Sequence, residues 1–393
     1  MENLPREVLS NIFIRLLAKQ LAQMRCVCKS WNALLSESSF IKSHLHHSIH
    51  HNDEILLFFS RVFSFYHSPF IHPSPLTPHP FPFTAHPSRS PNLKLKPSNF
   101  FKLPDKPKSE YSHGNVIGSI NGLICFNYGP FSLPSRDYAI YVWNPSLSAL
   151  LTLPPCPLPS GDSKTKTNFR FGYDPNADDY KVVKLTSLVP QVAVYSMRKG
   201  SWDLITQRFP LNMRIIKRKP EVCVDGYNGR LHWLCYTKFK RKLERIVAFD
   251  LGEETFSVIS LPDSILQHDQ NRWNVFGVLA GKLCVMSRVR DGDCEVWVMD
   301  DYGVAESWVK LHAFSQFDGA IYPYGFTLHN EFLFQVDIDR FALYAPIVAK
   351  PKNFENPCPL NVVDKVVHYV ESLVWVVPAE SEGRCYNISQ FPF

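Results

Sequence analysis

The stretch "NGRLHWLCYTKFKRKLERIVAFDLGEETF", residues 228–256, holds two short apolar segments separated by charged and turn residues. The first segment follows Asn228-Gly229, a strong turn signal, and is rich in leucine and aromatic side chains. The second, "IVAFD", ends in the polar run "LGEET". Two such segments of strand length, with turn residues at their ends, indicate a pair of antiparallel β-strands.

Both segments belong to series that recur along the chain. The first series continues in "NGLICF" at 121, "DDYKVVKL" at 178, "GKLCVM" at 281 and "NEFLFQV" at 330. The second continues in "YVWNPS" at 141, "VAVYSMRKGSW" at 192, "EVWVMDDYG" at 295 and "FALYAP" at 341. Each series has a period of roughly fifty residues, which is typical of repeat architectures. A hairpin sheet of that size cannot bury both faces alone, whereas radial stacking of copies can. We therefore predict an all-β, propeller-like domain of five to six blades of about fifty residues each.

Two further strand-like segments flank the array. They are "EILLFFSRVFSFYH" at 54 and "VVHYVESLVWVV" at 366. Pairing between them would close the ring and remove two open sheet edges, so we expect them to be neighbours.

The first 45 residues have helical rather than strand periodicity. One apolar face recurs every four positions, with Leu9 and Phe13 beside it, and consists of Leu4, Val8, Ile12 and Leu16. Pro5 stands where a first-turn proline is tolerated. A second stripe recurs at about 3.5 residues and consists of Leu21, Met24, Cys28, Trp31 and Leu35. Two or three short helices are expected between residues 5 and 45.

These patterns divide the chain into five parts. We expect a helical domain over 1–45, a linker and first strand region over 46–66, a Pro/His-rich loop over 67–110, the propeller over 111–380 and a tail over 381–393. Proline removes amide donors, so we read 67–110 as a disordered insertion, with a polyproline docking segment as the alternative.

Composition narrows the class of protein. A formal net charge of +6 over 393 residues is far from the balance of a nucleic-acid-binding domain. The 10 cysteines include no Cys-x-x-Cys pair, which fits reduced thiols in the cytoplasm or nucleus. The N-terminus does not resemble a signal peptide, and no apolar run approaches the length of a membrane span.

Two clusters raise the question of metal or acid–base chemistry. Cys26 and Cys28 lie near five histidines in "HLHHSIHH" at 44, but a helical register would send the two thiols to different faces. Asp174, Asp178 and Asp179 in "FGYDPNADDY" could hold calcium or move protons, although Asp-Pro and Asn-Ala-Asp-Asp are also ordinary turn sequences. No catalytic motif is present in the sequence, so we expect no metal, no cofactor and no catalytic residues.

Taken together, the motifs resemble those of plant F-box proteins of the F-box/kelch-repeat group, which includes the S-locus-F-box-like proteins. The F-box resemblance is carried by the Leu4-Pro5 opening, "RCVCKSW" at 25 and "FIKSHL" at 40. The resemblance to the F-box-associated, kelch-related propeller is carried by "SINGLICF", "VWNPS", "FGYDPNADDYKVVKL", "VYSMRKGSW", "GRLHWL", "FDLGEETF" and "YVESLV".

The resemblance implies a substrate-recognition adaptor of an SCF-type (Skp1–cullin–F-box) E3 ubiquitin ligase, a non-catalytic subunit that binds an unknown target protein. It implies a Skp1-type partner, and through it cullin and RING subunits, on the face formed by Leu4, Pro5, Val8, Leu9, Ile12 and Leu16. Inside the helical domain it implies a core that contains Met24, Cys28, Trp31 and Leu35. The alternative is a propeller-based binding protein or enzyme in which the N-terminal helices only cap the domain.

Two basic stretches are candidates for target recognition. One contains Arg214, Lys217, Arg218 and Lys219, and the other contains Lys238, Lys240, Arg241 and Lys242. With "EVCV" at 221 read as the strand before the Asn228 turn, both stretches would lie on one rim of the propeller, opposite that turn. A patch for an acidic partner and a pair of solvated hairpin tips are both compatible with this pattern.

Overall fold

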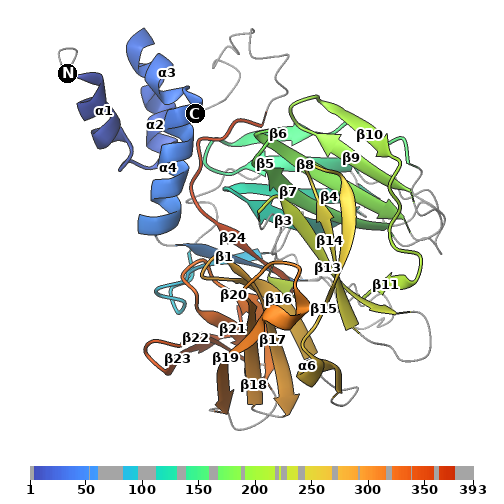
Figure 1. Ribbon diagram of the computed structural model, residues 1–393. Coiled ribbons are helices and arrows are strands. Elements are labelled where there is room, and N and C mark those ends of the chain that lie inside the picture. Colours follow the sequence, from blue (N-terminus) through green and yellow to red (C-terminus); the bar gives the residue numbers. More distant parts are fainter. Residues whose placement is uncertain are drawn as a thin grey trace, which may run out of the picture.

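The computed structural model describes residues 4–52, 54–60, 83–95, 112–130, 139–158, 167–186, 191–216, 221–222, 228–237, 244–267, 273–290, 293–315, 321–337, 339–357 and 363–376. In this part of the chain, helices gather at the N-terminus and strands form a ring of sheets (Figure 1).

The N-terminal helices are α1 (Arg6–Phe13), α2 (Ala18–Met24), α3 (Lys29–Leu35) and α4 (Ser38–His51). The stripe from Leu21 to Leu35 is therefore not one helix, because Cys28 has an extended backbone and separates α2 from α3. The helix α4 continues beyond residue 45 to His51, and the first strand begins a few residues later at Ile55.

The described strands form six sheets of four strands each. Blade one contains β3 (Ser112–Ile120), β4 (Leu123–Pro130), β5 (Ala139–Asn144) and β6 (Ala149–Thr152). Blade two contains β7 (Thr167–Asp174), β8 (Asp179–Thr186), β9 (Val192–Ser196) and β10 (Ser201–Ile205). Blade three contains β11 (Met213–Ile215), β13 (Arg230–Thr237), β14 (Glu244–Asp250) and β15 (Thr255–Ser260).

The second half of the ring follows the same plan. Blade four contains β16 (Trp273–Leu279), β17 (Lys282–Arg290), β18 (Asp293–Met299) and β19 (Trp308–Ser315). Blade five contains β20 (Tyr322–Phe326), β21 (Phe332–Gln335), β22 (Arg340–Ala345) and β23 (Lys350–Glu355). Blade six contains β12 (Glu221–Val222), β24 (Val363–Tyr369), β1 (Ile55–Ser60) and β2 (Phe83–Pro87). Two short connections are helical, α6 (Asp263–Gln267) and η1 (Ala305–Ser307).

The repeat found in the sequence corresponds to the second and third strands of a blade. The first series falls on β4, β8, β13, β17 and β21, and the second on β5, β9, β14, β18 and β22. Within each blade the two are hydrogen-bonded neighbours, as in the pairing of His232 with Ala248. The prediction of a small helical domain followed by a propeller-like domain is confirmed, with six blades.

The predicted ring closure is also confirmed. The strands β1 and β24 pair antiparallel, with Ile55 opposite Tyr369 and Phe58 opposite Val366. This joins the two flanking segments, which are more than three hundred residues apart, in one blade.

The expectation of a loop throughout 67–110 is wrong for part of that range. The strand β2 pairs with β1, with Ala85 opposite Leu57, and Leu95 bridges back to Ala85. The strand contains no proline from Phe83 to His86. It ends at Pro87, which is tolerated because β2 lies at the edge of its sheet. The rest of 67–110 lies outside the described residues.

Blade three begins differently from the expectation. The segment "EVCV" was expected to lead into the Asn228 turn as a strand of that blade, but β11 fills that place and pairs with β13. Instead, β12 runs parallel to β24 in blade six, with Glu221 opposite Lys365, and also lies beside β20 of blade five. A two-residue parallel pairing between distant segments leaves no periodic signal in the sequence, which is why it was missed.

Neighbouring blades share their apolar cores. One cluster joins Cys125 and Val142 of blade one to Phe171 and Val182 of blade two, all fully buried. Between blades four and five the packing is so close that a Cβ on Gly277 would lie 2.1 Å from a ring carbon of Phe326. The buried apolar residues thus form clusters between neighbouring blades, which join each sheet to the next around the ring.

The two faces of the ring differ. The helices contact the face that carries the turns between first and second strands, which we call the helical face. Gly122, in the turn between β3 and β4, lies against Ser372. The turns of blades four and five are joined by the Ala280 amide, which donates to Asn330 Oδ1 at 2.7 Å. The inner strands β16 and β20 begin at the other side, which we call the distal face. There Trp273 lies beside Tyr322, and Asn274 donates to Glu244 at the start of β14.

Candidate docking surfaces

Helix α1 has an exposed apolar side. Leu4, Val8 and Ile12 are 39%, 41% and 46% exposed, and Pro5 beside them is also exposed. Leu9 and Leu16, predicted as part of the same face, are instead half-buried and pack against the helical core. The structure therefore brings four of the six predicted partner residues together at the surface, and the other two anchor that surface from below.

Phe13 and Trp31 form the centre of the helical core. Their rings meet edge to face with centroids 4.9 Å apart, and Leu21 and Leu35 are fully buried around them. Of the predicted core residues, Trp31 and Leu35 are buried, while Met24 and Cys28 pack against the cluster from half-buried positions.

A residue from the far end of the chain completes this core. Leu373, which follows β24, is buried within the helical cluster, and Leu147 of blade one packs against it. Periodicity within residues 5–45 could not have revealed this contribution, because the partner is distant in sequence. Leu17, also unpredicted, adds an exposed apolar side chain at the start of α2.

Three polar contacts seat the helices on the propeller. The amide of Ala18 donates to Glu371 Oε2 at 2.9 Å, and the guanidinium of Arg25 lies 4.6 Å from the ring centroid of Trp375. Lys42 forms an ion pair with Asp178 at 2.7 Å. Burial raises the pKa of the Glu371 carboxyl, with the Ala18 amide and Lys19 opposing the shift. These contacts join α2 and α4 to the segment after β24 and to blade two, so the helical domain is attached to the propeller at several points.

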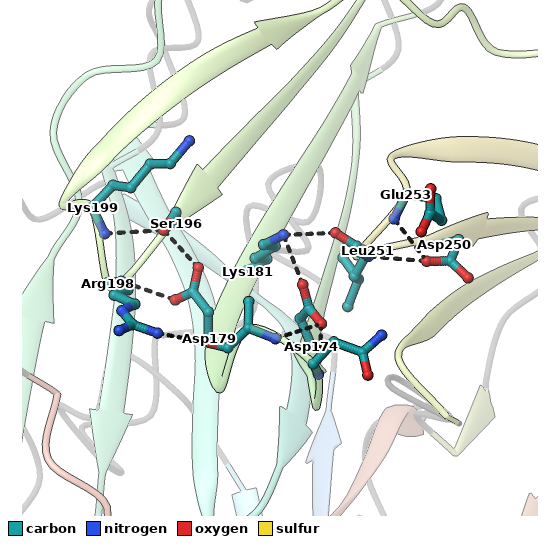
Figure 2. A network of polar contacts seen from close by, with 12 residues as sticks. Asp174, Asp179, Lys181, Ser196, Arg198, Lys199, Asp250, Leu251 and Glu253 are labelled. Atoms are coloured by element: carbon teal, nitrogen blue, oxygen red, sulfur yellow. Dashed lines mark hydrogen bonds and ion pairs between the residues drawn. The ribbon is translucent and has the colours of Figure 1, made fainter.

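The aspartates of "FGYDPNADDY" are structural (Figure 2). Asp174 accepts from the amides of Asn176 and Ala177 and from Lys181 at 3.0 Å, and Lys181 also donates to the Leu251 carbonyl of blade three. Burial alone would raise the pKa of Asp174, but these hydrogen bonds outweigh it and leave the pKa lowered. This network ties the turn of blade two to blade three.

The carboxylates of Asp178 and Asp179 also accept hydrogen bonds from the protein. Asp179 accepts from Ser196 Oγ at 2.6 Å and from the Arg198 amide at 2.9 Å (Figure 2). Asp178 accepts from Tyr173 and pairs with Lys42. All three aspartates are thus held by donors of the protein, as the turn interpretation requires.

The cysteine and histidine clusters form no metal centre among the described residues. Cys26 is exposed, and Cys28 lies at the start of α3, where its thiol contacts Ser30 Oγ at 3.1 Å. The histidines stack in pairs along α4, His46 on His50 and His47 on His51. Within the same part of the chain, no helix is long and apolar enough to cross a membrane.

The basic stretches are only partly visible. Arg214 is exposed on β11, opposite Tyr236 of β13. The other seven cations lie outside the described residues: Lys217, Arg218, Lys219, Lys238, Lys240, Arg241 and Lys242. The three residues of β11 pair with the last three of β13, so Arg214 lies close to the point where the second stretch begins. The premise that "EVCV" is a strand of blade three is wrong, because β12 lies in blade six. The placement of both stretches on one rim and their role in target binding stay predictions.

Comparison with known proteins agrees with the two-part architecture. Residues 1–46 match the model of the F-box-like family, and residues 81–328 match that of the F-box associated beta propeller domain. In Arabidopsis thaliana, F-box protein CPR1 is 26% identical over 79% of this chain and 73% of that protein. The F-box/kelch-repeat protein At3g23880 is 27% identical over 79% of each chain.

Similarity to solved structures is lower. The match to TolB from Acinetobacter baumannii, at 11% identity, covers 81% of this chain and 66% of TolB, with a TM-score of 0.42. The family match spans well over half of the residues and covers the strands of the ring from β2 to β20. With its F-box-like helices and its six-bladed ring, this chain belongs to the family of F-box proteins that carry an F-box-associated β-propeller domain.

Proposed function

We propose that the protein is the substrate-recognition adaptor of an SCF-type E3 ubiquitin ligase. In this proposal α1 docks a Skp1-type subunit, which brings the cullin and RING subunits, and the propeller binds a target protein. The chain itself supplies no covalent chemistry; it raises the local concentration of the target near the ubiquitin-carrying enzyme. Its place of action is the cytoplasm or the nucleus, as the cysteine usage suggests.

The exposed row on α1 is the observation that carries this proposal. Leu4, Val8 and Ile12 remain in solvent although Phe13 of the same helix is buried. Burying each of these aliphatic side chains in a partner contributes about 1.5–3 kcal/mol before the costs of association. Helices that only capped the propeller would direct their apolar side chains inward, so this row favours the adaptor over the capping alternative.

A binding experiment with a purified Skp1-type protein tests the proposal. We expect Val8→Asp combined with Ile12→Asp to lower affinity at least about a hundredfold, because two charges would be desolvated at the interface. Leu4→Ala combined with Pro5→Ala should abolish capture as well. Val258→Asp on β15 and Val309→Asp on β19 are matched controls, since both residues are exposed aliphatics on the outer strands of blades three and four.

The readouts are calorimetric affinity and thermal melting of each variant. Unchanged affinity in the α1 variants would show that the contact surface lies elsewhere. Equal losses in the α1 and control variants would show that the effect is general rather than specific to α1.

A further inference from the structure

Two turns on the helical face, in blades three and four, are joined by one arginine. The turn between β14 and β15 spans residues 251–254, and the turn between β18 and β19 spans residues 300–307. Both lie on the helical face, because the strands of a blade alternate in direction. Arg230, at the start of β13, pairs with Asp250 at 3.1 Å and stacks on Tyr302 with its guanidinium 4.7 Å from the ring centroid. Side chains of two blades therefore form one continuous surface.

The described residues of this surface, which we call the acidic rim, carry a large excess of negative charge. They include six carboxylates and two cations, namely Asp250, Glu253, Glu254, Asp300, Asp301 and Glu306 against Arg230 and Lys282. Arg230 is paired with Asp250, and Lys282 is paired with Asp300 at 2.8 Å. The other four carboxylates form no ion pair with a described residue, and three of them are exposed. The charge of the rim is therefore not neutralised by its own cations.

The same face of the adjoining blades carries a more even charge. On blade two, Lys199 pairs with Asp203 at 2.7 Å, and on blade five, Lys352 pairs with Glu331 at 2.9 Å. The excess of carboxylates is therefore confined to blades three and four. Complementary charge selects partners and speeds their encounter, so the acidic rim favours a partner that carries cations.

An aromatic and an apolar side chain lie within the acidic rim. Val304 is 46% exposed, and Tyr302, two residues before it, is half-buried. The Tyr302 hydroxyl lies 2.8 Å from His232 Nε2. Ser307 Oγ donates to the Val304 carbonyl at 2.8 Å and accepts from the Asp301 amide at 3.1 Å. These hydrogen bonds order the loop before any partner arrives, which reduces the entropic cost of binding at a tyrosine, a side chain that contributes strongly to interfaces.

We propose that the acidic rim binds an extended basic segment of the target protein, with an apolar target residue packed on Tyr302 and Val304. Lysine or arginine side chains of the segment pair with the four carboxylates that have no cation of their own. This inference rests on the proposed adaptor function and locates its target site. The helices contact blades one and two and the segment after β24, so a target bound to blades three and four leaves α1 free for the ligase partner.

The chain offers a matched control on its distal face. Glu355 ends β23, and Asp263 begins α6 after the end of β15. Both are exposed carboxylates that form no ion pair with a described residue. Glu355→Lys combined with Asp263→Lys, the distal variant, therefore changes the net charge as much as Glu253→Lys combined with Asp301→Lys, the rim variant.

The experiment measures fluorescence anisotropy of a dye-labelled polylysine peptide with one central leucine, on the full chain. We expect binding that weakens as salt rises, because exposed charges are screened. The rim variant should lower affinity at least about tenfold, and the distal variant should leave it unchanged. Val304→Ser should lower affinity about threefold, whereas Val258→Ser, at a 45% exposed position of β15, should not. Melting temperatures confirm that the variants are folded, and Skp1-type capture is recorded for each variant.

Several results would overturn the proposal: no binding of the polylysine peptide, equal losses in the rim and distal variants, or equal binding of a polyglutamate peptide of the same length. Self-association of the chain that the rim variant abolishes, without peptide binding, would also overturn it and assign the surface to a second copy. If peptide binding behaves as expected but Skp1-type capture fails, the adaptor function is wrong and the surface stands. The reverse result leaves the adaptor function and removes the surface.

Discussion

Glu371, in the segment after β24, joins the helices to the propeller through a hydrogen bond. Its carboxylate accepts from the Ala18 amide, and burial raises its pKa. A raised pKa means that any stability from this group is present at low pH and is lost as pH rises through the folded-state pKa. At neutral pH the buried charge is thus a cost that the hydrogen bond must offset.

Substitutions at Glu371 separate the charge from the hydrogen bond. Glu371→Gln keeps an acceptor for Ala18 and removes the charge, so we expect unchanged or slightly increased stability at pH 7. Glu371→Ala leaves the Ala18 amide without its acceptor and should cost about 1–2 kcal/mol. Urea denaturation of both variants provides the measurement, and a larger loss for Gln than for Ala would contradict this account.

The positions of single residues could be predicted where a pattern recurs within a few positions of the sequence. Val8 and Ile12 could be assigned to one face because they lie four residues apart on α1, and Leu4 precedes that helix at the same spacing. Glu371 and Trp375 could not be assigned to the helical domain, because Ala18 and Glu371 are 353 residues apart and no pattern links them.

The turn between β3 and β4 has no room for a side chain at its glycine, whereas the similar turn between β16 and β17 does. Gly122 has a φ of +78°, and a Cβ there would lie 2.4 Å from Ser372 Cβ and 2.5 Å from the Val370 carbonyl. Gly281, between β16 and β17, has a φ of +73° and no heavy atom within 4 Å of such a Cβ.

This pair of glycines distinguishes backbone strain from displacement of a segment. Gly281→Ala should cost about 1 kcal/mol from strain alone. Gly122→Ala should cost at least about twice as much, because it also pushes away the segment that carries Glu371 and Leu373. Thermal melting gives the stability, and limited proteolysis of the helical domain should increase only in Gly122→Ala. Equal losses in the two variants would show that the segment moves aside freely.

The strands of the ring were predictable to different degrees. The second and third strands of five blades were found because their sequences repeat. The strand β2 was missed because prolines surround it, and β12 because two residues paired in parallel with a distant strand produce no alternation.

For the molecule as a whole, buried histidines predict acid sensitivity. Burial lowers the pKa of His44 in the helical domain, of His86 in blade six, and of His232 in blade three, the last to about 3. Since the unfolded chain binds these protons near pH 6.5, the stability is fully present above that pH and is lost as pH falls.

We expect stability to fall below pH 6.5 by up to about 1.4 kcal/mol per pH unit for each such histidine. His232→Gln should reduce the slope while keeping a polar partner for Tyr302. His50→Gln, at an exposed position of α4, should leave the slope unchanged. Urea midpoints across pH 7 to about pH 5 test this, and identical slopes in all three proteins would contradict it.

The shared core of the helices and the segment after β24 also sets an order of events during translation. The helices leave the ribosome first, yet Leu373 and Glu371 arrive only when the last strand of the ring has been made. A chain interrupted before residue 363 has an open sheet edge at β1 and a helical core with one wall missing. The helical core that supports α1 is therefore completed only when the last strand of the ring has been made, and an interrupted chain leaves part of that core exposed.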